Sequence, residues 1–178
     1  MLDPFIHIED FTMRCLLLRR VQAFWLGFTT LLLAPAVAAA PDNAPFQATI
    51  FFSEQTAFAD PSLPCMLIGS ITGTGVATKV GAVHLASTDC IVPVSASSYM
   101  FSSQQVVLSV RSGDQLWATY GGTLSAASGI IAGTYTIFGG TGRFTHATGA
   151  GIVTGFEQLD LATGSGTGQL QLKGSLSY

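Results

Sequence analysis

The chain has 178 residues, with only seven Lys and Arg against ten Asp and Glu and a formal net charge of −3. A chain so poor in basic residues has no surface that could neutralise phosphates, so nucleic acid is excluded as an expected partner. Apolar residues make up 48% of it, which is too much for a disordered chain, and the length suits one domain with a single core.

The first 40 residues have the composition of an export signal. Arginines precede an uncharged, mostly apolar run over residues 21–40, and the run ends in three small alanines that suit a signal peptidase. We therefore predict a signal peptide that is cleaved near Ala40. The remaining residues, 41–178, are expected to form one secreted or periplasmic domain.

Two alternatives bear on this leader. Residues 1–12 are too acidic for the start of a signal, so translation is expected to begin at Met13. An uncleaved membrane anchor is the second alternative, because twenty residues can cross a bilayer, although Pro35 weakens such a span.

Beyond the leader, polar and apolar residues alternate with a period of two between glycine-rich breaks. This alternation is typical of β-strands with one buried face, and no long stretch has a helical period. Seven or eight strands joined mainly by hairpins predict an all-β closed barrel or a sandwich. The expected strands cover residues 46–52, 106–111, 115–120, 130–138, 152–161 and 169–177, with a looser pattern over 69–85.

Two cysteines, Cys65 and Cys90, follow the leader, and both would enter an oxidising compartment. A disulfide between them is the first interpretation. A metal site that adds His84 and His146 is the alternative. It lacks the closely spaced ligand pairs that metal sites use, so we predict neither a metal nor a cofactor.

Residues 139–149 read Gly-Gly-Thr-Gly-Arg-Phe-Thr-His-Ala-Thr-Gly and are the most distinctive segment of the chain. They resemble the signature of the allene oxide cyclase and dirigent barrel-like superfamily, especially its small exported bacterial members. Residues 112–116 and 73–81 resemble two weaker motifs of that group, with Lys79 where a His is common. The resemblance implies an antiparallel barrel of eight strands, and a homotrimer by analogy with the plant relatives.

Arg143 and Phe144 are the only bulky groups in this motif, and they have two interpretations. In the first, Arg143 stands at the barrel mouth and holds a polar end of a ligand in its planar guanidinium. In the second, Arg143 bonds to carbonyls of the glycine turn and Phe144 plugs the barrel end. The glycines themselves are of the kind that backbone geometry requires, which favours the second interpretation.

Three functions remain open for such a barrel. We favour the binding of a small apolar or amphipathic ligand over catalysis, with Arg143 and Phe144 joined by an aromatic lining of Phe46, Phe52, Trp117, Tyr135 and Phe156. The resemblance implies a cofactor-independent isomerase or cyclase as the alternative. The weak candidates for its acid or base are Glu157, Asp160 and His146. The third possibility is a structural or adhesive module whose interior is filled with side chains.

Overall fold

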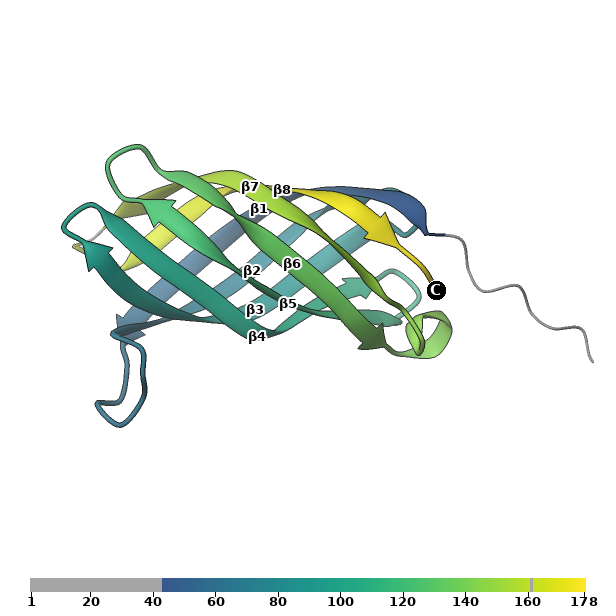
Figure 1. Cartoon of the computed structure of the whole chain (residues 1–178), viewed down its shortest axis with the longest axis horizontal. Coiled ribbons are helices and arrows are strands. Elements are labelled where there is room, and N and C mark those ends of the chain that lie inside the picture. Colours follow the sequence, from purple (N-terminus) through teal and green to yellow (C-terminus); the bar gives the residue numbers. More distant parts are fainter. Residues whose placement is uncertain (1–42, 161) are drawn as a thin grey trace, which may run out of the picture. The chain divides into compact units, whose positions relative to one another are not determined.

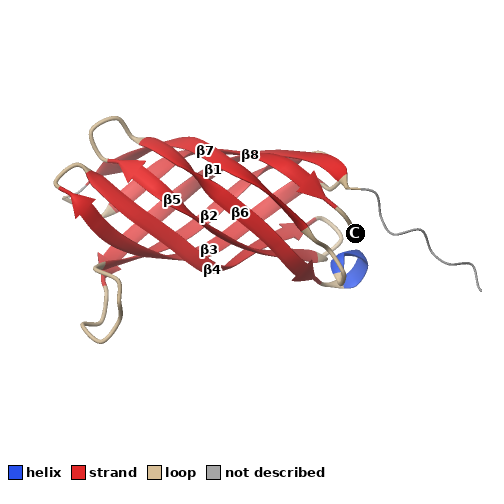
Figure 2. Cartoon of the chain, viewed as in Figure 1, coloured by secondary structure: helices blue, strands red, loops and turns tan. Residues whose placement is uncertain are grey.

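The computed structural model describes residues 43–160 and 162–178, which form a closed antiparallel barrel (Figures 1 and 2). Each strand pairs with the next one in sequence, and the last strand pairs with the first. The all-β barrel prediction is therefore confirmed, and the sandwich is excluded. The strands are β1 (Ala44–Phe58), β2 (Leu67–Ala77), β3 (Gly81–Ser95), β4 (Ser98–Val110), β5 (Gln115–Ser125), β6 (Ile130–Gly140), β7 (Gly149–Asp160) and β8 (Ser165–Leu176).

The predicted leader and its cleavage site at Ala40 lie outside the described residues. In the part of the chain that the structure describes, no helix is long and apolar enough to span a membrane. The one helical element among the described residues is a single 3₁₀ turn, η1 (Gly142–Phe144), within the glycine-rich motif.

The alternation of side chains sorts each strand into an inner and an outer face. Along β1, Phe46, Ile50 and Phe52 are buried in the barrel, whereas Phe51 between them is 63% exposed on the outside. This is the period-two geometry expected for a sheet that closes around one core. The strands are longer than the alternation alone indicated, because pairing with two neighbours extends them into their polar ends.

One predicted strand is corrected by the structure. The loose pattern over residues 69–85 covers most of β2, a turn and the start of β3. Lys79 lies in that turn with a positive φ of 72°, which no residue inside a strand adopts. Val80, in the turn, is apolar and buried at the barrel end, so the apolar pattern continues through the turn. The sequence pattern therefore did not reveal where β2 ends and β3 begins.

A β-bulge in β4 re-aims the side chains near one end of the barrel. Ser103 pairs with Tyr120 and Val106 pairs with Ala118, so two residues of β4 lie opposite one residue of β5. The extra residue lets both Ser103 and Val106 point into the barrel. The bulge thereby brings the polar side chain of Ser103 into the barrel interior.

The two ends of the barrel differ. At the end that carries the C-terminus and η1, the right-hand end in Figure 1, Phe144 is fully buried beneath its turn and packs edge-on against Tyr178 at 4.8 Å. Gly140 leaves the room for this plug, since a Cβ there would lie 2.7 Å from the Cβ of Phe144. The opposite end is surrounded by the loops that follow β1, β3, β5 and β7.

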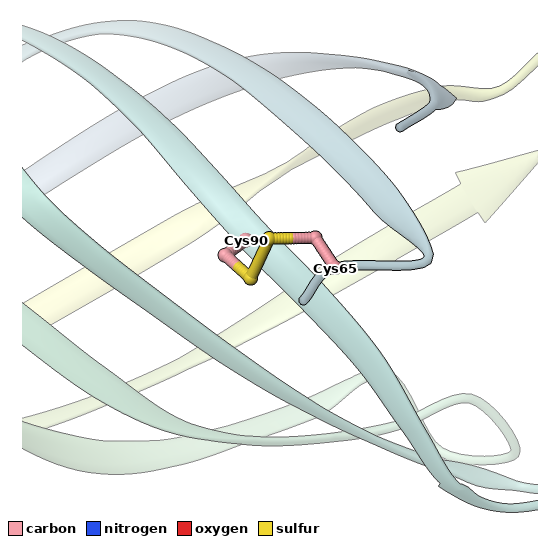
Figure 3. Close-up of a disulfide and its surroundings, with 2 residues drawn as sticks. All are labelled: Cys65 and Cys90. Carbon is pink, nitrogen blue, oxygen red and sulfur yellow. A yellow bond between two sulfur atoms is a disulfide. The ribbon is translucent and has the colours of Figure 1, made fainter. Parts of the chain in front are cut away.

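The predicted disulfide is present. Cys65, in the loop between β1 and β2, is bonded to Cys90 in β3, with their Cα atoms 5.2 Å apart (Figure 3). The bond holds the loop between β1 and β2 against the neighbouring strand at the open end. Both cysteines are used in it, so neither is left for the alternative metal site.

Candidate functional site

A cavity of about 390 Å³ lies at the open end of the barrel, and we call it the mouth cavity. A smaller space of about 40 Å³, the carboxyl chamber, lies next to it and farther in. Both spaces are lined by Glu54, Ile91, Tyr99 and Leu124, which therefore mark the boundary between them. Deeper still, toward the plug, an apolar void of only about 20 Å³ shows that this half of the interior is filled.

Three acidic side chains from different strands enter the carboxyl chamber. They are Glu54 of β1, Asp89 of β3 and Glu157 of β7. Glu54 and Glu157 lie on either side of β8, which presents glycine at the positions opposite them in the pairing. A Cβ on Gly166 would collide with the Glu157 carboxyl, and a Cβ on Gly69 with that of Glu54. The glycines thus make room for the two glutamates inside the barrel.

Asp89 is fully engaged in a buried polar network. The Tyr120 hydroxyl lies 2.6 and 2.7 Å from the two oxygens of Asp89 and donates its proton to this carboxylate. The Ser87 hydroxyl donates a second hydrogen bond over 2.7 Å, and the Ser103 hydroxyl lies 3.0 Å from that of Ser87. Asp89 is therefore held by the protein itself, as buried carboxylates usually are.

Glu54 and Glu157 are different, because each is buried with a free acceptor. They are 7% and 5% exposed, and Oε1 of each has no hydrogen-bond partner. An unpaired oxygen inside a protein costs free energy, so such atoms in a cavity indicate a group that binds there. Glu54 lines both the chamber and the mouth cavity, so its side chain lies between the two spaces.

The pKa values of all three acids are raised, with burial as the largest cause. Burial, followed by a hydrogen bond to the Glu157 carboxyl and by the charge of that carboxyl, raises the pKa of Glu54 to about 9. Burial also raises the pKa of Glu157. The pKa of Asp89 rises only to about 6, because the hydrogen bonds from Tyr120 and Ser87 partly offset its burial. At neutral pH the chamber therefore holds protonated and ionised carboxyl groups side by side.

These shifts predict that the protein loses stability as the pH rises. The folded state keeps a proton on Glu54 that the unfolded chain releases between its ordinary pKa of 4.5 and about 9, so the free energy of unfolding falls across that window. Asp89 acts in the same direction between pH 3.8 and about 6. We expect a free energy of unfolding on the order of 2 kcal/mol lower at pH 8 than at pH 5, measured by urea denaturation.

The variant E54Q tests the origin of this slope, because glutamine keeps the shape of the side chain and cannot ionise. It should flatten the dependence between pH 5 and pH 8, whereas D160N should retain it. The exposed Asp160 has a lowered pKa, so its contribution to the free energy of unfolding changes only as the pH falls below its ordinary pKa of 3.8. A wild-type protein that is more stable at pH 8 than at pH 5 would contradict the assignment.

The structure separates the three candidates for an acid or base. Glu157 points into the carboxyl chamber. Asp160 is exposed in the outer strand end, where its carboxylate accepts a hydrogen bond from the backbone N–H of Ala162. His146 is exposed in the loop at the plugged end, away from the chamber.

The predicted ligand contacts Arg143 and Phe144 lie at the plugged end, which corrects the expectation that Arg143 stands at an open mouth. Phe144 fills the end of the barrel, as in the second interpretation of the motif. The Arg143 guanidinium stacks 4.6 Å from the centre of the Phe144 ring and lies 4.0 Å from Asp114. The chain turns there through Gly142, whose φ of +55° a side chain would strain.

The predicted aromatic lining is corrected in part. Phe52 lines the chamber, and Phe46 and Tyr135 line the deeper apolar void. Trp117 lies between the buried Leu116 and Ala118 and therefore points outward, and Phe156 is 46% exposed on the outer face. Alternation determines these orientations, because neighbouring residues of a strand face opposite sides.

The sequence analysis missed Glu54, Asp89 and Tyr120. A usable signal was present, since Glu54 continues the inward phase of Phe46, Ile50 and Phe52 in β1. A charged residue in phase with the apolar face of a strand indicates a buried charge, which proteins retain only where it is paired or functional.

The acidic cluster does not have the arrangement of a metal centre. Within residues 43–160 and 162–178, no group of three or more His, Cys, Asp and Glu is placed to hold a metal ion. Both oxygens of Asp89 are already bonded to Tyr120, which leaves two glutamates with one free oxygen each.

No known family profile matches the chain, and no curated protein sequence matches it. Solved structures do resemble it. The pterocarpan synthase dirigent protein GePTS1 has a TM-score of 0.51 at 13% identity, over 82% of this chain and 96% of that one. The pterocarpan synthase dirigent protein PsPTS1 has a TM-score of 0.45 at 14% identity, over 76% of this chain and 98% of that one. The likeness to GePTS1 shows that the chain has the barrel fold of that dirigent protein.

Proposed function

We propose that this protein is an exported barrel that binds a small amphipathic ligand at its open end. The observation that carries the proposal is the pair of buried glutamates with free oxygens, Glu54 and Glu157, at the inner end of an accessible cavity. The apolar body of the ligand would occupy the mouth cavity, and its polar group would meet the carboxyls.

Size and lining support this proposal. The mouth cavity, at about 390 Å³, falls in the range of roughly 300 to 1,000 Å³ that is typical of small-molecule sites. Phe58, Met66 and Leu67 contribute to its apolar wall, and the disulfide holds the loop before Met66 in place. The filled half of the barrel serves as a rigid support. A disulfide also suits an exported protein, because oxidising compartments preserve it.

Binding can be tested with phenylnaphthylamine, a neutral fluorescent probe whose emission rises in apolar sites. We expect saturable binding to the wild-type protein. In L124W, a larger side chain stands at the boundary between the mouth cavity and the carboxyl chamber, and the affinity should fall about tenfold or more.

T123W is the matched control, because Thr123 adjoins Leu124 in β5 and its exposed side chain points outward. It should bind the probe within about twofold of the wild type. An absence of saturable binding to the wild type, or equal loss of affinity in both variants, would contradict the proposed site. Native mass spectrometry of protein from its own host would then show whether a natural ligand co-purifies.

Cofactor-independent isomerisation or cyclisation is a second candidate, favoured by one observation. Glu54 is protonated at neutral pH beside a second carboxyl, so the pair contains both a proton donor and an acceptor. Conversion of an allene oxide, followed by chiral chromatography, would test it. A racemic product at the uncatalysed rate, with wild type and E54Q alike, would count against this candidate.

A further inference from the structure

The charges around the carboxyl chamber all have one sign. Glu54, Asp89 and Glu157 lie in its wall, and no Lys, Arg or His of the described chain lines either the chamber or the mouth cavity. The six basic residues among those described are all exposed: Lys79, His84, Arg111, Arg143, His146 and Lys173. The part of the chain that the structure describes therefore offers these acids no positive partner.

Two acceptors in the chamber wall have no hydrogen-bond partner. Oε1 of Glu54 and Oε1 of Glu157 are buried and unpaired, while the Tyr120 hydroxyl is committed to Asp89. A carboxylate at such a site is stabilised most by a charged donor, because hydrogen bonds to charged groups are about twice as strong as neutral ones. An anionic head group would be repelled by the ionised carboxylates there.

The rest of the chamber wall is aliphatic and aromatic, and its aromatic rings favour an organic cation over a metal ion. Phe52, Tyr99, Phe101 and Tyr120 line the chamber together with the acids. Ring faces attract ammonium groups, whereas Ca²⁺ and Mg²⁺ require six or more oxygen ligands. The described residues supply no such set.

The sizes of the two spaces indicate a ligand with a small head group and a larger body. The chamber, at about 40 Å³, exceeds the minimum for one water molecule, roughly 10 to 15 Å³ on the same measure, and has room only for a small head group. The mouth cavity is about 390 Å³ and opens directly onto it past Glu54 and Tyr99.

We propose that the ligand is an amphipathic amine whose protonated nitrogen enters the carboxyl chamber, between Glu54 and Glu157, while its apolar body fills the mouth cavity. This inference rests on the proposed ligand-binding function and narrows it to a chemical class. The ammonium group donates to the two free glutamate oxygens and lies against the aromatic rings. Asp89, held by Tyr120 and Ser87, adds negative charge without changing its own hydrogen bonds.

Three molecules of equal chain length test the head group: n-octylamine, n-octanol and octanoate, each used to displace phenylnaphthylamine at pH 7. We expect octylamine to displace the probe at about tenfold lower concentration than octanol, with octanoate weaker than both. In E157Q and in E54Q the advantage of octylamine over octanol should shrink to about twofold. D160N, which removes an exposed carboxylate from the end of β7, should keep the full advantage.

Proton release gives an independent measurement. Glu54 is protonated before the ammonium group arrives, so octylamine should expel part of a proton and octanol none. Calorimetry in two buffers with different ionisation enthalpies measures this release, and E54Q should abolish it.

The outcomes separate this inference from the proposed function. If octanol or octanoate displaces the probe as well as octylamine does, the amine assignment is wrong and the ligand-binding function stands. An octylamine advantage that survives in E54Q, E157Q and the double variant would place the ammonium elsewhere and overturn the inference. A wild-type protein that binds neither the probe nor any of the three molecules would remove both proposals.

Discussion

Replacing Phe144 with alanine is expected to lower the free energy of unfolding by about 3 to 5 kcal/mol. The side chain is fully buried, packs against the Tyr178 ring and closes one end of the barrel. Its removal would leave a cavity that the rigid ends of paired strands cannot fill, and the surrounding core would lose its contacts. Chemical denaturation of the wild type and F144A measures the difference.

F51A is the matched control for this variant, because Phe51 is 63% exposed on the outside of β1. We expect it to cost less than about 1 kcal/mol. R143A should leave the affinity for phenylnaphthylamine within about twofold of the wild type, since Arg143 lies at the end opposite the mouth cavity. A stable F144A, or an R143A that no longer binds the probe, would show that the glycine motif is a binding site instead of a plug.

Removal of the disulfide in the double variant C65S/C90S is expected to destabilise the protein by about 3.5 kcal/mol. The bond joins two residues with a sequence separation of 25. The expected loss of stability follows from the conformational entropy that the unfolded chain loses when a loop of this length is closed. The comparison is made by denaturation under oxidising conditions.

The same variant should also weaken binding of the probe, because Met66 and Leu67 of the mouth cavity directly follow Cys65. Reduced wild-type protein provides the control, since it should match C65S/C90S in both stability and affinity. Equal stability of oxidised and reduced wild type would contradict a structural role for the bond.

Much of the fold could be predicted from the sequence, because the alternation of polar and apolar residues is visible within each strand. The alternation in residues 169–177 places Leu170, Leu172 and Leu176 on one face, and all three lie on the inner side of β8. The prediction was weakest at two kinds of place. At Val80 the apolar alternation continues through a turn, and at Ser103 a bulge shifts the alternation by one residue. At both places the pairing with neighbouring strands, and not the local pattern, decides the structure.

The candidate site could be predicted only in part. Glu157 was among the candidates, but its partners Glu54 and Asp89 lie about a hundred and about seventy residues earlier in the chain. Nothing local indicates that these three side chains share one chamber, because this depends on the closure of β8 on β1 and on the register of every hairpin. The homotrimer implied by the family resemblance stays a prediction.

The class of fold could be predicted from the amino-acid sequence alone, as could the inward face of most strands and the pairing of Cys65 with Cys90. Alternation is visible within each strand, and only two cysteines follow the leader. Which end of the barrel is plugged and which is open became visible only in the folded barrel. The same holds for the meeting of three acids in one chamber, which no basic residue of the described chain lines. Barrel closure brings strands together that are distant in sequence, and the energies of buried charges depend on those neighbours.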